Sequence, residues 1–121
     1  TDRLFDQTMA IGDDRPCIGL VAVVNGPEWE RLCAELGLDP KDDAALRSRE
    51  ATQAALRRVK AAASGFPNYG VPRVITLLRE PWTIDNGLLT PTLKIKRAKV
   101  VARYGAEIDA MYEAIAPKKK A

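Results

Sequence analysis

The chain has 121 residues and a mass of 13.3 kDa, a size that suits one folded domain. Hydrophobic residues make up 46% of it and charged residues 29%, as in ordinary globular proteins, and no apolar run reaches the roughly 18 residues of a membrane-spanning helix. With no histidine, and with Cys17 and Cys33 as its two thiols, the sequence excludes the common zinc-binding patterns. We therefore expect no metal site in this chain and two inert thiols in its core.

The net charge of +3 conceals a strong asymmetry along the sequence. Residues 1–46 carry 4 basic and 10 acidic side chains, whereas residues 47–121 carry 15 basic and 6 acidic ones. This pattern predicts that the second half of the chain faces something anionic, either a phosphate-bearing ligand or the acidic surface of another domain. Nucleic acid is the competing candidate, but the cations are scattered and no recognisable nucleic-acid-binding motif accompanies them, so we expect no nucleic-acid partner.

Two apolar runs near the start of the chain predict an antiparallel pair of strands. Residues 7–11 form the first run, and residues 12–16 form a turn that contains glycine and proline. Residues 17–24 are β-branched and nearly continuously apolar, which is typical of a strand buried on both faces. A helix is expected next, with Pro27 at its first position and Gly37 just past its end.

A second, longer helix is predicted after a polar linker. Apolar and small residues repeat at helical spacing from Thr52 to Ala63, and Asp42 or Asp43 can cap the start of this helix. Residues 71–78 then predict a third strand, with a proline near its beginning.

The last predicted element is a helix whose apolar stripe begins at Val101 and which runs to about Ala116. The expected order is β-β-α-α-β-loop-α, which describes a small α+β domain with a three-stranded mixed sheet and packed helices. We assign residues 1–116 to this domain and expect the basic residues 117–121 to form a disordered tail.

Residues 82–97 combine a turn, a helix start and a group of cations. The Asn-Gly pair at 86–87 favours a tight turn because both residues tolerate positive φ. The Thr-Pro pair at 90–91 supplies a capping side chain and a ring suited to a first helical position, so Lys94 is expected at the edge of a helix. From the residues alone, a solvated basic helix start remains the alternative interpretation of these cations.

The same segment, Trp-Thr-Ile-Asp-Asn-Gly-Leu-Leu-Thr-Pro-Thr-Leu-Lys-Ile-Lys-Arg, resembles a motif in the C-terminal part of long-chain fatty-acid–CoA ligases. These enzymes belong to the adenylate-forming, AMP-binding superfamily, and the resemblance extends more loosely over nearly the whole chain. Asp85 stands where the family usually has glutamate, and Trp82 where it has phenylalanine. Lys94 matches the lysine used to make the acyl-adenylate, so the resemblance implies that Lys94 is the catalytic residue.

The resemblance also implies substrates and a partner. ATP, CoA and a long-chain fatty acid would be the substrates, Mg would be bound in the parent enzyme outside this chain, and the N-terminal adenylation domain of the same protein would be the partner. Thr90 and Thr92 would orient the loop or touch the nucleotide, while Lys96 and Arg97 would balance ATP or CoA phosphates. Structural capping by Thr90 and simple solvation of the two cations are the alternatives.

In the same reading, the chain is a mobile lid domain that lacks its first elements and is inactive alone. A partly uncovered sheet face would then favour self-association of this fragment. The expected location is cytoplasmic, with the parent enzyme peripheral at a membrane as an option. The competing class of function is a free-standing basic α+β module that binds another macromolecule, including nucleic acid, and salt-dependent binding would distinguish it.

Overall fold

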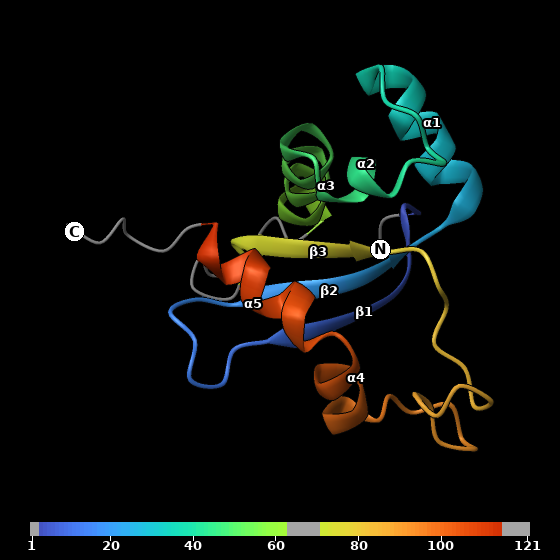
Figure 1. Cartoon of the computed structure of the whole chain (residues 1–121), viewed down its shortest axis with the longest axis vertical. Helices are drawn as coiled ribbons and strands as arrows, with labels where there is room; N and C mark the ends of the chain where they lie inside the picture. The colour runs from blue at the N-terminus through green and yellow to red at the C-terminus, as the bar shows by residue number, and fades with distance from the viewer. Residues whose placement is uncertain (1–2, 63–70, 115–121) are drawn as a thin grey trace.

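The computed structural model describes residues 3–62 and 71–114 and has one mixed sheet at its centre (Figure 1). The sheet has the order β1-β2-β3. β1 (Phe5–Ile11) pairs antiparallel with β2 (Gly19–Val24), and β2 pairs parallel with β3 (Val74–Leu78). The predicted α+β fold with a three-stranded mixed sheet is therefore confirmed, although β3 begins later than the predicted strand.

Helices cover both faces of this sheet (Figure 1). On one face lie α1 (Gly26–Leu36), α2 (Asp43–Arg47) and α3 (Arg49–Ala62), whose apolar residues share a core cluster with that side of the strands. On the other face lie α4 (Arg97–Arg103) and α5 (Gly105–Glu113), together with the segment that precedes them. The domain is thus a three-layer arrangement of helices, sheet and helices.

The middle strand, β2, divides the core into two clusters. Successive residues of a strand point to opposite faces, so Leu20, Ala22 and Val24 join the cluster under the first three helices. Val21 and Val23 join the cluster under α4 and α5. All six residues of β2 are buried, as expected for a strand covered on both faces.

Local capping signals set the bounds of the first helices. The Asn25 side chain accepts a hydrogen bond at 3.0 Å from the backbone N–H three residues ahead, and α1 begins at the next residue, one position before Pro27. Gly37 adopts φ 74° at the end of α1, as predicted. Asp42 caps α2 by accepting from Ala44 N at 3.0 Å, which confirms one of the two predicted caps.

The predicted second helix is divided into α2 and α3. Ser48 breaks it by adopting an extended conformation, with φ −66° and ψ 149°, and its Oγ accepts from Ala51 N at 3.1 Å. One serine therefore ends the first helix and caps the second, because its hydroxyl competes with main-chain hydrogen bonding. In α3 the buried positions are Ala51, Ala54 and Ala55, while the predicted stripe residue Ala63 lies outside the described residues.

The predicted final helix is also divided, into α4 and α5, at Tyr104. This residue has φ −111° and ψ 26°, is buried, and precedes Gly105, whose low helix propensity favours a break. Val101, predicted in the apolar stripe, is 39% exposed, whereas Val100 is fully buried. The observed order is β-β-α-α-α-β-loop-α-α, and Ala116 and the tail lie outside the described residues.

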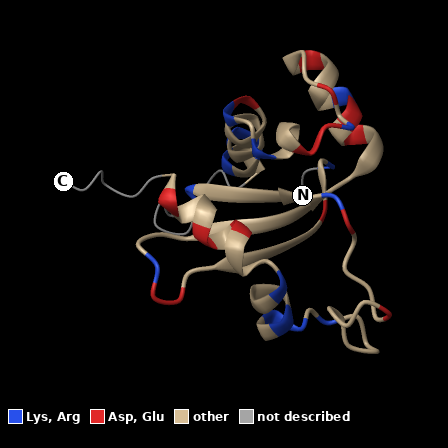
Figure 2. Cartoon of the chain, in the orientation of Figure 1, with Lys and Arg blue, Asp and Glu red and all other residues tan. Residues whose placement is uncertain are grey.

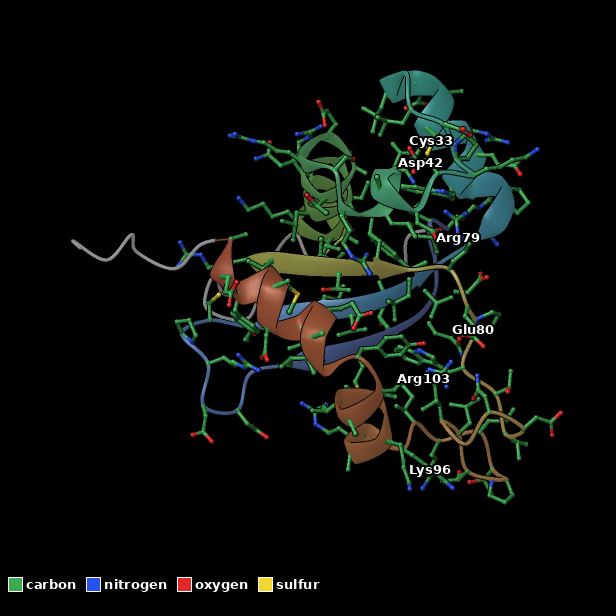
Figure 3. The ribbon with its side chains drawn as sticks, in the orientation of Figure 1. Cys33, Asp42, Arg79, Glu80, Lys96 and Arg103 are labelled. Carbon is green, nitrogen blue, oxygen red and sulfur yellow. The ribbon has the colours of Figure 1, made fainter. Side chains whose placement is uncertain are left out.

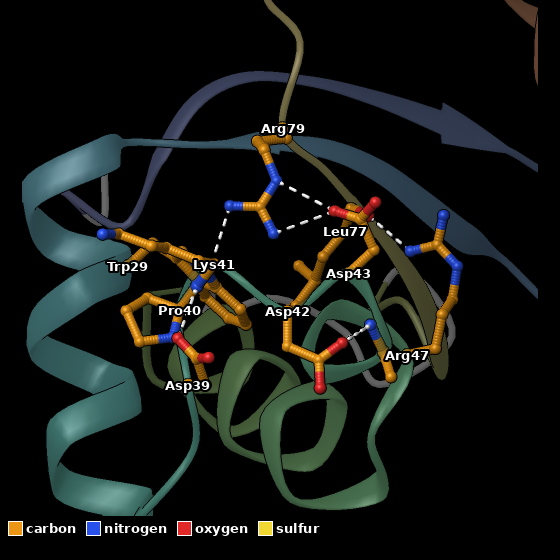
Figure 4. Close-up of polar contacts among 10 residues, drawn as sticks. Trp29, Asp39, Pro40, Lys41, Asp42, Asp43, Arg47, Leu77 and Arg79 are labelled. Carbon is orange, nitrogen blue, oxygen red and sulfur yellow. Dashed lines mark hydrogen bonds and ion pairs between the residues drawn. The ribbon is translucent and has the colours of Figure 1, made fainter.

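Arginines fasten the linker before α2 to the end of β3 (Figure 4). The Arg79 guanidinium donates to Pro40 O at 2.8 Å and pairs with the Asp43 carboxylate at 3.2 Å. Trp29 Nε1 donates to the same carbonyl at 3.1 Å, and Arg47 donates to a carbonyl of β3. These contacts fix the point at which the chain leaves β3 toward residues 82–97. In the described part of the chain, no helix combines the length and hydrophobicity needed to cross a membrane.

Candidate functional site

The segment between β3 and α4 begins at a tryptophan anchored to the sheet. Trp82 is 2% exposed and packs in the cluster under α4 and α5. Gln7 of β1 holds its main chain on both sides: Gln7 Oε1 accepts from Trp82 N at 2.7 Å, and Gln7 Nε2 donates to Trp82 O at 2.9 Å. Everything that follows Trp82 therefore starts from a fixed position beside β1.

A tight turn centred on Asn86 comes next, as predicted. Asn86 Oδ1 accepts from Thr83 N at 2.9 Å and from Leu88 N at 3.2 Å, while Asn86 Nδ2 donates to Pro81 O at 2.9 Å. Gly87 has φ 82°, a conformation open to glycine at no steric cost. One side chain thus satisfies three main-chain groups of the turn.

Residues 88–96 form a short β-hairpin, so the predicted helix start at 90–91 is wrong. Lys96 N donates to Leu88 O at 2.8 Å, and Thr90 N donates to Lys94 O at 2.8 Å. Leu93 N donates to Thr90 O at 2.7 Å and closes a turn around the proline. A proline φ suits the second position of such a turn as well as a first helical position, and α4 begins only at Arg97.

Leu93 occupies an unusual conformation at the tip of this hairpin. Its φ is 67°, in the left-handed region that costs a residue with a Cβ about 1–2 kcal/mol. This conformation is the one required at the third residue of a three-residue hairpin loop, where glycine is the common choice. The leucine side chain is 65% exposed, so burial within the chain does not offset that cost.

Lys94 is the first residue after the loop, and Thr90 fixes its main chain. Thr90 Oγ1 accepts from Lys94 N at 3.0 Å and lies 3.1 Å from Thr92 Oγ1. The two threonines predicted to bind nucleotide are therefore next to the predicted catalytic lysine, and Thr90 caps the hairpin turn instead of a helix. The Lys94 side chain is exposed and has no hydrogen bond or ion pair with any described residue.

Further cations follow on the same side of the domain (Figure 2). Lys96 lies just before α4 (Figure 3), and Arg97 is the first residue of α4. Both side chains are exposed and form no ion pair with a described residue. The first turn of α4 contains no acidic residue, so its cations face the positive end of the helix dipole uncompensated. Arg103, at the other end of α4, pairs with Glu80 at 2.9 Å. An anion placed here would relieve this repulsion.

Exposed apolar side chains lie on the same hairpin and on the turn before it, and sequence reasoning missed them. Ile84 is 47% exposed, Leu93 65% and Ile95 36%. Beside them lies a shallow hollow of about 360 Å³ lined by Trp82, Thr83, Ile84, Asp85, Leu89 and Leu93. An apolar residue in a sequence is ordinarily assigned to the core, so no pattern signals this surface.

A larger hollow of about 900 Å³ lies between α3 and the connection from β1 to β2, away from the hairpin. It contains none of the predicted ligand-binding residues. Two groups with shifted pKa values in the described part of the chain also lie away from the hairpin. Burial raises the pKa of the Cys33 thiol and of the Tyr112 hydroxyl. Among residues 3–62 and 71–114, no three or more cysteine or carboxylate side chains are placed to hold a metal ion.

Known proteins resemble this chain over nearly its full length. No protein-family model matches it. A chloroplast long-chain-fatty-acid–acyl-carrier-protein ligase of Arabidopsis thaliana is 34% identical over 110 residues, which are 91% of this chain and 14% of the relative. Long-chain-fatty-acid–CoA ligase 1 of Homo sapiens is 33% identical over 101 residues, 79% of this chain and 14% of the relative. The chain thus spans about one seventh of these relatives.

A solved structure shares the fold. The A domain of carboxylic acid reductase from Segniliparus rugosus, in complex with AMP and a co-purified carboxylic acid, matches with a TM-score of 0.72 and 29% identity. The match covers 93% of this chain and 16% of that one. The sequence comparison thus matches this chain to fatty-acid ligases, and the structure comparison matches it to the A domain of a carboxylic acid reductase.

Proposed function

We propose that this chain supplies the lysine for acyl-adenylate formation in a larger ligase. The proposal rests on its homology to long-chain fatty-acid ligases and to carboxylic-acid adenylation domains. In that reaction a fatty-acid carboxylate oxygen attacks the α-phosphorus of ATP, and the bond to pyrophosphate breaks. The thiol of CoA then attacks the acyl carbon, and AMP leaves. Lys94 acts in the first of these two steps.

The observation that carries the proposal is the placement of Lys94. Joining a carboxylate to a phosphate brings two anions together, so the transition state requires positive charge between them. Lys94 offers a cation at the projecting end of a hairpin, with no carboxylate among the described residues to neutralise it. A lysine also carries its charge on a long stem, which suits insertion into a site on another domain.

Neighbouring residues support the same role. The Thr90 hydroxyl sets the direction of the main chain at Lys94. The Thr92 hydroxyl lies 3.1 Å from the Thr90 hydroxyl and is available to a nucleotide at the hairpin. Lys96 and Arg97 add positive charge where phosphates of ATP or CoA would approach. The proposed roles are orientation for the threonines and charge balance for the two cations.

The remaining machinery belongs to the proposed partner, the larger adenylation domain of the same protein. This sequence contains no Gly-rich phosphate-binding loop, and we propose that the ATP site, the magnesium ion and the acyl site lie on that domain. Such a division of labour makes the chain inactive alone. It also makes the movement of the hairpin into and out of the active site a step of the cycle.

The test uses the full-length protein and separates the two half-reactions. In Lys94→Ala, we expect acyl-adenylate formation to fall about 100-fold or more, as when one charge-stabilising donor is removed from an active site. Thioester formation from a pre-made acyl-adenylate should persist. Lys60→Ala is the matched control, since Lys60 is an exposed lysine on α3, on the other face of the sheet, and should keep both rates.

Two results would contradict the proposal. Unchanged adenylate formation in Lys94→Ala would return the basic cluster to an ordinary solvated surface. Tight binding of DNA or RNA by the wild-type chain, falling steeply with salt and lost with Lys96→Ala and Arg97→Ala, would favour the nucleic-acid-binding alternative.

Comparing CoA with acyl carrier protein as the thiol substrate then identifies the acceptor, because the relatives include ligases named for each.

A further inference from the structure

The tip of the hairpin carries a residue that the fold of the chain does not explain. Four described residues have φ between 58° and 82°: Gly37 and Gly87, which adopt it freely, Asp14, a short polar residue, and Leu93. Leu93 is the outlier, because a large apolar side chain is both strained there and 65% exposed. Leu93 stabilises neither the loop conformation nor the core. We therefore expect its side chain to contact a surface outside this chain.

Leu93 belongs to an apolar rim, which we define as Ile84, Leu93 and Ile95. Two of these residues, Ile84 and Leu93, line the hollow. Trp82 and Leu89 add apolar lining, and Thr83 and Asp85 add polar lining, so the rim borders a hollow that is apolar over most of its lining. Ile84 is 47% exposed and Ile95 36%. Contiguous exposed apolar side chains around a hollow mark interaction sites more often than single exposed ones do.

Charge identifies the kind of surface that the rim fits. Lys94 lies between Leu93 and Ile95 in the sequence, and Lys96 and Arg97 follow directly. All three side chains are exposed, and none pairs with a described carboxylate. A partner that complements both features has an apolar recess bordering an anionic centre. The carboxylic acid reductase A domain that shares this fold binds AMP and a carboxylic acid, and a site that holds two such ligands has the anionic centre that these cations require.

We propose that Leu93 is a positioning residue whose side chain seats the hairpin in an apolar recess of the adenylation domain, beside the nucleotide, and so sets where Lys94 enters the site. This inference rests on the proposed function. An exposed lysine on a flexible stem has many conformations, and an adjacent apolar anchor reduces the number compatible with docking. The strained leucine is therefore retained for its side chain, at the expense of loop stability.

The experiment compares Leu93→Gly, Leu93→Ala and Leu93→Met in the full-length protein, measuring adenylate formation and thioester formation separately. Loss of a buried leucine anchor should lower kcat for adenylation about tenfold or more in the glycine and alanine variants. The KM values for ATP and fatty acid, and the thioester step, should stay near wild type. Methionine should restore most of the rate, because it is apolar and of similar size.

Stability separates positioning from a structural role. Leu93→Gly relieves the positive φ, so its melting temperature should equal or exceed that of wild type while its adenylation rate falls. A structural role would lower stability and rate together. Val101→Ala is the control, because Val101 is 39% exposed on α4 but does not line the hollow, and both of its rates should be unchanged.

Several outcomes would overturn the inference. If Lys94→Ala loses adenylation but Leu93→Gly keeps it, Leu93 does not position the lysine and the proposed function stands. If Lys94→Ala keeps adenylation, both fail. A changed dependence of KM on acyl-chain length in Leu93→Gly would show that the fatty acid, and not the adenylation domain, contacts Leu93 at the hollow. A changed sedimentation coefficient in the same variant would show that a second copy of the chain contacts it.

Discussion

Replacing Thr90 by valine removes a single hydroxyl that closes the hairpin around Lys94. The lost interaction is the 3.0 Å hydrogen bond that Thr90 Oγ1 accepts from Lys94 N, while the main-chain bond from Thr90 N to Lys94 O stays possible. Such bonds contribute about 0.5–1.5 kcal/mol net, and one on an exposed loop belongs in the lower part of that range. A loss of about 0.5–1 kcal/mol raises the open-to-closed ratio of the hairpin about 2- to 5-fold.

Amide hydrogen exchange measured by NMR reports this ratio directly. The Lys94 amide should exchange about 2- to 5-fold faster in Thr90→Val, while amides of β2 keep their rates and show that the fold is intact. Thr92→Val is the control, since the Thr92 hydroxyl contacts the Thr90 hydroxyl at 3.1 Å and leaves the bond to Lys94 N in place. Equal Lys94 exchange in wild type and Thr90→Val would refute the assigned role of Thr90.

Three further predictions concern the free energy of unfolding, measured in urea. Tyr104→Phe should leave it unchanged or raise it, because the buried Tyr104 hydroxyl has no partner among the described residues. Tyr112→Phe should lower it by about 1–2 kcal/mol, since the Tyr112 hydroxyl shares its one proton between two carbonyl oxygens, at 2.7 and 3.1 Å. Gly19→Ala should lower the free energy of unfolding by about 1–3 kcal/mol, because the new Cβ would lie 2.8 Å from Tyr112 Oη. Gly26→Ala is the control, since a Cβ at Gly26 meets nothing within 4 Å. Burial raises the pKa of the Cys33 thiol, so the folded state favours the neutral thiol. The free energy of unfolding should therefore fall as the pH rises through that pKa, and Cys33→Ala should abolish this pH dependence.

The parts of the fold that the sequence predicted well depend on local signals. The continuous apolar run of β2 has few alternatives to a strand buried on both faces. Gly37 and Asp42 act within their own turns, so their capping roles follow from residue type and position. The sheet and its mixed pairing can therefore be predicted from the sequence.

The errors occur where two local structures suit the same residues. A threonine followed by proline starts a helix or a turn equally well, and the hairpin bond between Leu88 and Lys96 decides for the turn. The break at Tyr104 depends on where its ring packs, which apolar periodicity does not encode. Residue spacing does not identify Ser48 as a cap, because its capping role depends on the extended conformation that it adopts.

The candidate site divides in the same way. Lys94, Thr90 and the neighbouring cations were identified by resemblance to a sequence motif, and the structure adds how the hairpin holds them together. The exposure of Ile84 and Leu93 had no signal in the sequence, because surface leucines and core leucines look alike there. The positive φ of Leu93 was equally hidden, since leucine is among the residues least expected in that conformation.

The central claim is that Lys94 serves the adenylation step. The most direct measurement is ATP–pyrophosphate exchange, dependent on fatty acid, by the full-length protein carrying Lys94→Ala, at saturating ATP and with Lys60→Ala in parallel. We predict that exchange falls about 100-fold or more in Lys94→Ala and stays at the wild-type rate in the control. Wild-type exchange in both variants would contradict the claim.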